Sequence, residues 1–176
     1  MSDSILKLIP RERGFVPDAC THQQAVQRLE EFFTEHEGVS VRIYPHLEFI
    51  DQGENLEAII CPSCAARLVI DYFNEDDPIR EWWDQANLEA DVHHGEDVFE
   101  LNPGAGCRMP CCQAEVKFID LEFDWPGGFA RFELTIDNPQ VERPIDNPQS
   151  DTLTPAQLHE LEAILGCQLR LIWARY

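Results

Sequence analysis

The chain has 176 residues, of which 33 are acidic and only 13 basic, so its net charge is −20. Such an acidic surface repels phosphate groups, which excludes nucleic acid and anionic membranes as expected partners and favours a basic protein. The hydrophobic share of 44% is ample for a folded core. No apolar run approaches the roughly 20 residues of a membrane-spanning helix.

The N-terminal sequence MSDSILKLIPRERG contains no apolar segment long enough for a secretory signal. We therefore expect a cytoplasmic protein. In a reducing compartment, its seven cysteines are thiols or metal ligands rather than a disulfide framework.

Hydrophobic periodicity predicts one helix and several short strands in the first sixty residues. Apolar residues recur at helical spacing after Thr21, where Gln24 completes a capping-box pattern, and Gly38 supplies a stop. The predicted elements are a helix over about 22–36, a strand over 39–43 that Pro45 interrupts, its continuation over 47–50, and a strand over 56–60.

Proline, glycine and cap residues divide the rest of the chain. Asp77 followed by Pro78 predicts a helix start, and Thr154 followed by Pro155 predicts another. The remaining predicted elements are a loop over 91–115, strands over 116–123 and 130–136, and a final strand from 169. The pentapeptide Ile-Asp-Asn-Pro-Gln occurs at 136–140 and at 145–149, which predicts an extended loop.

Together these elements predict an α+β fold with a mainly antiparallel sheet covered by amphipathic helices. We expect a single domain over 1–176. The segment 61–112, which is bounded by cysteines, is expected to form a zinc-ribbon-like insertion on it.

The strongest chemical pattern is Cys61-Pro-Ser-Cys64 followed by Cys111 and Cys112. A Cys-x-x-Cys turn presents two thiolates at a spacing that suits tetrahedral zinc, and a second pair completes a structural site with no open position for water. Adjacent cysteines point in different directions, so Cys107 or His94 could replace one of them. A ribbon that has lost its metal and a redox role for the Cys-x-x-Cys are the alternatives.

Two weaker patterns allow a metal-dependent hydrolase or nuclease. The loop with His93 and His94 could hold a metal, although a solvated acidic loop also explains it. Glu115-Val-Lys117 fits half of a nuclease site with Asp91 or Asp97 upstream, but DNA would have to approach a strongly negative protein. No phosphate-binding loop, Gly-x-Ser-x-Gly elbow or His-Glu-x-x-His is present, so we expect no catalytic residues.

Negative charge is concentrated between Asp71 and Glu100, where eleven acids accompany one base. A basic protein could dock there on a tryptophan anchor, because tryptophan is enriched in interface hot spots. The candidate partner-binding residues are Asp76, Asp77, Glu81, Trp82, Trp83 and Asp84. Consecutive helical residues lie about 100° apart, so we expect one ring buried and one partly exposed. Alternatively, both rings pack in the core and the acidity only aids solubility.

Several stretches resemble a group of uncharacterised bacterial proteins that pair a zinc-ribbon-like segment with an α+β body. They are Phe49-Ile-Asp-Gln-Gly53, Cys61-Pro-Ser-Cys64, Pro110-Cys-Cys112, Phe129-Ala-Arg-Phe-Glu-Leu134 with Asn138-Pro139, and Leu165-Gly166 through to Ala174-Arg-Tyr176. The resemblance maps the cysteine motif onto Cys61, Cys64, Cys111 and Cys112 and supplies no catalytic residue. Gln113 stands where glycine is more usual.

Small acidic bacterial proteins without catalytic motifs are frequently immunity proteins, and this chain is similar to them in general character. The sequence therefore favours an immunity protein that neutralises a bacterial toxin by direct binding. A zinc-ribbon adaptor or regulator of cellular machinery is the alternative.

Overall fold

The protein's structure, a computed structural model, describes residues 3–93, 99–140 and 153–176. It divides into two compact units, the first made of Met1–Pro45 and Ala130–Tyr176 and the second of His46–Phe129. The predicted insertion, 61–112, lies within the second unit, which extends beyond it at both ends.

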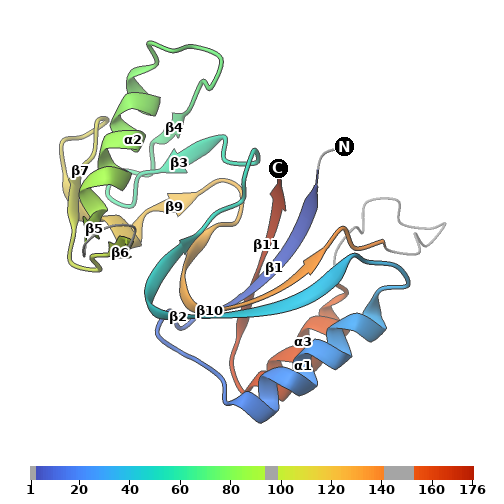
Figure 1. The fold of residues 1–176 in the computed structure, drawn as a ribbon. Coiled ribbons are helices and arrows are strands. Elements are labelled where there is room, and N and C mark those ends of the chain that lie inside the picture. Colours follow the sequence, from blue (N-terminus) through green and yellow to red (C-terminus); the bar gives the residue numbers. More distant parts are fainter. Residues whose placement is uncertain (1–2, 94–98, 141–152) are drawn as a thin grey trace. The chain divides into compact units, whose positions relative to one another are not determined.

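The first unit is a four-stranded sheet with two helices lying side by side on one of its faces (Figure 1). The strand order is β11-β1-β10-β2. In chain order the elements are β1 (Ser4–Pro10), α1 (Ala19–Phe32), β2 (Gly38–Ile50), β10 (Gly128–Asp137), α3 (Pro155–Leu165) and β11 (Leu169–Arg175).

Neighbouring strands of this sheet run antiparallel. β1 pairs antiparallel with β10 and with β11. Between β2 and β10, the hydroxyls of Ser40 and Thr135 lie 2.7 Å apart, and the Tyr44 hydroxyl donates to Glu133 at 2.6 Å. Residue numbers in these contacts increase along β2 and decrease along β10, so these two strands also run antiparallel. The order β-α-β-β-α-β is the ferredoxin-like arrangement. The predicted α+β class is confirmed.

The core of this unit lies between the sheet and its two helices. Alternate residues of the strands face the helices, and side chains there are almost fully buried: Leu6, Leu8, Ala25, Leu29, Phe132, Leu134, Ile136 and Leu161. The intervening Lys7 and Glu133 are also buried, and both have partners. Lys7 Nζ donates to the Tyr176 hydroxyl at 2.7 Å, and Glu133 accepts from Tyr44.

Helix α1 begins before the predicted residue 22 and ends before residue 36. Its cap is Asp18, whose carboxylate accepts the backbone N–H groups of Cys20 and Thr21. The predicted capping box at Thr21 is wrong, because the Thr21 hydroxyl instead donates to the Asp18 carbonyl inside the first turn.

Among the remaining elements of the first unit, β10, α3 and β11 lie where strands and a helix were predicted, whereas β1 was not predicted. β2 continues through Pro45 instead of breaking there, which an edge strand tolerates because a proline without N–H costs it no ladder bond. α3 has the predicted capping box between Thr154 and Gln157, and Gly166 ends it with φ 74°. The second pentapeptide, 145–149, lies outside the described residues.

The second unit combines small sheets with one helix. A three-stranded sheet has the order β4-β3-β9, and two hairpins pair β5 with β6 and β7 with β8. The bounds are β3 (Ala58–Ile60), β4 (Arg67–Val69), α2 (Pro78–Ala90), β5 (Asp91–His93), β6 (Phe99–Leu101), β7 (Gly106–Arg108), β8 (Glu115–Lys117), the 3-10 turn η1 (Phe118–Asp120) and β9 (Glu122–Phe123).

An aromatic cluster forms the core of this unit. The Trp83 ring stacks on Phe118 with centroids 5.6 Å apart and meets Phe49 and Phe123 edge-on. Phe129 packs against Phe118 and Phe49. These rings bury α2 against the sheet.

The predicted loop over 91–115 is wrong, because β5, β6 and β7 lie within it. Each is three residues long, too short to show alternation in the sequence, and is stabilised by antiparallel pairing with a neighbouring strand. The predicted strand over 116–123 is interrupted by η1, because the chain turns where Phe118 enters the aromatic cluster.

Candidate metal centre

The first cysteine pair occupies the tip of a β-hairpin. β3 and β4 pair with Ile60 opposite Arg67, and the tip between them spans residues 61–66. Two backbone bonds close it, from Cys61 N–H to the Ala66 carbonyl at 2.9 Å and from Ala65 N–H to the Cys61 carbonyl at 2.8 Å. Ala65 has a left-handed φ of 58°, which turns the chain sharply after Cys64.

The second pair occupies the tip of the hairpin between β7 and β8, where Arg108 lies opposite Glu115. Met109 N–H donates to the Ala114 carbonyl and Gln113 N–H donates to the Met109 carbonyl, both at 2.9 Å. Gln113 adopts φ 61°, so it takes the conformation that a glycine would adopt more easily. The absence of glycine therefore does not alter this turn.

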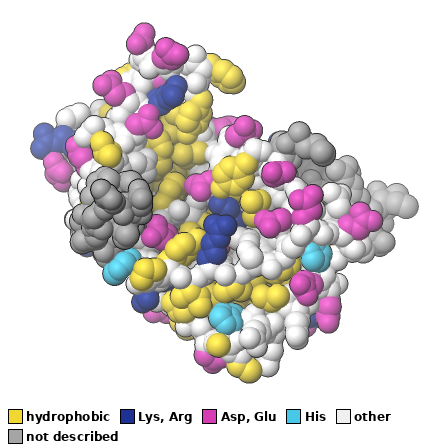
Figure 2. Space-filling model, viewed as in Figure 1, with side chains coloured by type: hydrophobic (Ala, Val, Ile, Leu, Met, Phe, Trp, Pro, Cys, Tyr) yellow, Lys and Arg dark blue, Asp and Glu magenta, His cyan; other side chains and the backbone are white. Residues whose placement is uncertain are grey.

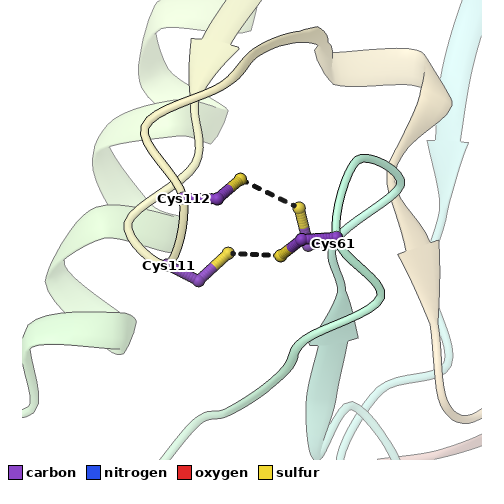
Figure 3. Close-up of side chains that lie close together, drawn as sticks. Cys61, Cys111 and Cys112 are labelled. Atoms are coloured by element: carbon purple, nitrogen blue, oxygen red, sulfur yellow. Dashed lines mark hydrogen bonds between the residues drawn. The ribbon is translucent and has the colours of Figure 1, made fainter.

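The two hairpin tips bring four sulfur atoms together (Figure 3). The Sγ atoms of Cys61 and Cys112 are 3.7 Å apart, and those of Cys64 and Cys111 are 3.5 Å apart. All four lie within 4.8 Å of one another. The adjacent cysteines 111 and 112 thus reach one common centre, in spite of their different directions along the chain.

These separations suit a tetrahedral metal ion. Zn–S bonds of about 2.3 Å in a tetrahedron place neighbouring sulfur atoms about 3.8 Å apart. The shorter separations in the cluster are within a few tenths of an ångström of that value. Four cysteines fill every position of a tetrahedral ion, so the donor set is that of a closed, structural site.

The Cys61 sulfur is buried and lies in a field of backbone donors. Burial opposes ionisation of the thiol, but the backbone N–H groups of Cys64 and Ser63, together with the side chains of Cys64 and Cys111, lower the pKa of Cys61 to about 7. At Cys111, partial desolvation of the sulfur and the neighbouring sulfur groups raise the pKa to about 12. The first tip therefore favours a thiolate at Cys61, whereas Cys111 requires a cation to ionise near neutral pH.

Of the two alternative ligands, Cys107 is described by the structure and is not part of this cluster. Cys107 is buried within β7 and is not among the four gathered sulfurs, and burial raises its pKa to about 11. His94 and Asp97 lie outside the described residues, and the side chains of Asp91 and His93 are likewise not described. Among the described residues, no second group of three or more metal-binding side chains gathers.

The structure also accounts for the predicted nuclease residues Glu115 and Lys117. They lie on β8, as the strand-like tripeptide suggests. The Glu115 carboxylate accepts from Arg108 Nε at 2.8 Å, across the hairpin, so it is engaged in a local ion pair.

The candidate partner-binding residues divide into exposed and buried ones. Asp76, Glu81 and Asp84 are exposed on the loop before α2 and on α2 itself. They line a shallow, open hollow together with Glu75, Arg80, Gln85 and Leu88. Figure 2 shows acidic side chains gathered around this part of the second unit, in the upper part of the view.

The other three candidates are engaged within the unit. Asp77 is buried and caps α2, accepting the N–H groups of Ile79 and Arg80. Trp83 belongs to the aromatic cluster. Trp82 is half-buried, and its indole N–H donates to the Arg108 carbonyl at 2.9 Å. One ring is thus buried and one partly exposed, as expected.

Exposed apolar side chains also lie near these acids in the chain, and they were not among the predicted partner-binding residues. Phe73 is fully exposed, and Tyr72 and Leu88 are also exposed. An exposed phenylalanine inside an acidic segment was visible in the sequence as Asp71-Tyr-Phe-Asn-Glu75. The prediction named the tryptophans because tryptophan is enriched in interface hot spots, although its large ring is most often largely buried.

Comparison with protein-family models, curated proteins and solved structures finds no match to this chain. In the part of the chain that the structure describes, every helix is too short or too polar to span a membrane. The candidate site is therefore interpreted from its own geometry.

Proposed function

We propose that this chain is a non-catalytic binding protein in which a structural zinc ribbon supports an acidic surface for a basic protein partner. The observation that carries the proposal is the uneven charge of the two units. The second unit has nineteen acids and four bases, a net charge of −15 out of −20, and it is also the unit with the four-cysteine cluster.

Zinc is the ion that best matches the donor set. Four cysteines at tetrahedral spacing bind zinc through thiolates, and such a closed site leaves no position for a reacting water. When bound, the ion would supply charge neutralisation and a crosslink between the tips at Cys61–Cys64 and Cys111–Cys112. A cytoplasmic location, where thiols stay reduced, is part of this proposal.

The acidic surface supplies the recognition. Asp76 is exposed on the loop before α2, Glu81 and Asp84 are exposed on α2, and Phe73 and Leu88 add apolar area close to them in the chain. Carboxylates would speed the encounter with a basic partner, and apolar contacts would slow dissociation. An immunity protein bound to a basic toxin is the most specific form of this function, and an adaptor of cellular machinery is the alternative.

Metal analysis tests the scaffold. The reduced full-length protein is expected to contain one zinc ion per chain by native mass spectrometry. The variant C64S is expected to lose it, whereas C20S and C167S, which change cysteines of the first unit, are expected to keep it. A wild-type protein that takes up no zinc would refute the scaffold.

Charge-neutralising variants test the recognition. Affinity capture compares the wild type with D76N/E81Q/D84N and with the control E12Q/E30Q/E37Q, which removes the same charge from exposed positions of the first unit. We expect capture of a basic partner whose association rate falls as the salt concentration rises. The association rate should also fall with D76N/E81Q/D84N, but not with the control variant. Equal binding by both variants would count against the acidic surface. A partner encoded beside this chain and toxic alone supports immunity, and a housekeeping protein supports an adaptor.

A further inference from the structure

The two hairpin tips correspond residue by residue. Cys61, Pro62 and Cys64 of the first tip match Met109, Pro110 and Cys112 of the second. The same two backbone bonds close both tips, and the residue after each last cysteine is left-handed. The second tip therefore has the same turn as the first, with methionine at the position that Cys61 occupies in the first.

Burial supports this correspondence. Cys61 is 1% exposed and Met109 is 0% exposed, and both belong to the core cluster of the unit. Two residues earlier in each hairpin, Ile59 and Cys107 are also buried. The matching pattern places position 109 where the first tip has its buried cysteine.

The ligands of the two tips differ in one position. In the second tip the missing cysteine at 109 is compensated by Cys111, which corresponds to Ser63 of the first tip. Ser63 and Cys111 are both exposed, and the Cys111 sulfur nevertheless lies 3.5 Å from that of Cys64. A side chain at the third position of the turn can therefore reach the centre of the cluster.

We propose that the first and third positions of each tip are interchangeable ligand positions, and that Cys111 does for the second tip what Cys61 does for the first. This inference rests on the proposed zinc site and assigns a latent ligand position to Met109 and to Ser63. A cysteine at either position can serve as a ligand of a tetrahedral thiolate-binding cation, provided that each tip supplies two cysteines.

Moving the ligand within the second tip is the first test. Zinc affinity of the reduced full-length chain is measured by competition with a chromophoric chelator. C111S should weaken binding by more than about 100-fold, the upper range for loss of an outer-shell partner alone. M109C/C111S should recover at least about 10-fold of that loss, and the control M109L/C111S should recover none.

The same exchange in the first tip changes the core volume less than replacement of the buried Met109 does. C61S replaces one buried atom, and C61S/S63C moves the thiol from the first position to the exposed third position. The double variant should bind zinc at least about 10-fold more tightly than C61S. This minimum is the lower end of the range for an outer-shell partner, and a restored ligand should exceed it. Circular dichroism of the single variants shows whether the fold persists.

The outcomes separate this inference from the proposed function. If the wild type binds no zinc, the proposed site itself is wrong and the inference falls with it. If the wild type binds one zinc ion but neither double variant recovers affinity, the interchange of positions is refuted while the zinc site stands. Unchanged affinity in C111S would also refute it, because Cys111 would then not be a ligand.

Discussion

Replacement of the two adjacent tryptophans should separate core packing from surface contact in the second unit. Trp83 is 5% exposed and has ring contacts with Phe118, Phe49 and Phe123 at 5.6 to 5.9 Å. Removal of a buried aromatic side chain costs about 3–5 kcal/mol. Each aromatic pair adds about 0.5–1.5 kcal/mol beyond burial, so we expect Trp83→Ala to lie at the upper end of that range.

Trp82→Ala should cost much less. Its ring is half-buried, and the hydrogen bond that its indole N–H donates to the Arg108 carbonyl contributes about 0.5–1.5 kcal/mol net. We therefore expect a loss of about 1–2 kcal/mol, within the ordinary range of single substitutions. The measurement is urea unfolding of the reduced, zinc-loaded protein, followed by far-ultraviolet circular dichroism.

Trp83→Phe is the matched control, because it keeps a ring in the cluster and should lose less than Trp83→Ala. Trp125, which is 42% exposed, provides a surface comparison. If Trp82→Ala destabilised the protein as much as Trp83→Ala, the division between a core ring and a surface ring would be wrong.

Three further substitutions test local structure. Hydrogen bonds from backbone N–H groups, first that of Asp71, lower the pKa of Asp77. The stability that the Asp77 carboxylate contributes is therefore complete above its unfolded-state pKa of about 4, and it is lost as the pH falls through the folded-state pKa. The difference in stability between the wild type and D77N should disappear in the same way in an acid titration. Gly127→Ala would place a Cβ 2.5 Å from Oε1 of the buried Gln52 and should cost about 1–3 kcal/mol of stability, measured by thermal unfolding. Gly38→Ala is the control, because a Cβ at residue 38 would have no atom within 4 Å. Thr154→Ala removes the α3 capping box and should cost about 1 kcal/mol in urea, with Thr154→Ser largely unaffected.

The sequence predicted best those elements whose ends have their own chemistry. Thr154 and Gly166 define α3, and Asp77 starts α2, because cap residues act on neighbouring backbone groups. The strand β1 was harder to recognise. It is the sheet's interior strand between β10 and β11, and its burial from Leu6 to Pro10 depends on residues more than a hundred positions away.

The cysteine ligands were predictable in identity but not in arrangement. Cys-x-x-Cys spacing identifies the first tip from the sequence alone. The second tip lacks that spacing, and its similarity to the first becomes visible only in backbone bonds and in the positive φ of Gln113. Hydrogen bonding and backbone conformation, rather than residue type, made Met109 recognisable as the counterpart of Cys61.

Charge and metal binding are linked in the second unit. Its strands β3, β4, β7 and β8 are three residues long, and isolated hairpins of that size are marginal in water. The unit also carries a net charge of −15 before any thiol ionises. Four thiolates would add four more negative charges in one small cluster, and a divalent zinc ion would remove two of them while joining both hairpin tips. The carboxylates proposed to favour a basic partner therefore add to the repulsion among the thiolates that a bound zinc ion would have to offset. Loss of zinc should then weaken partner binding by destabilising the fold of the second unit, rather than by removing a direct contact.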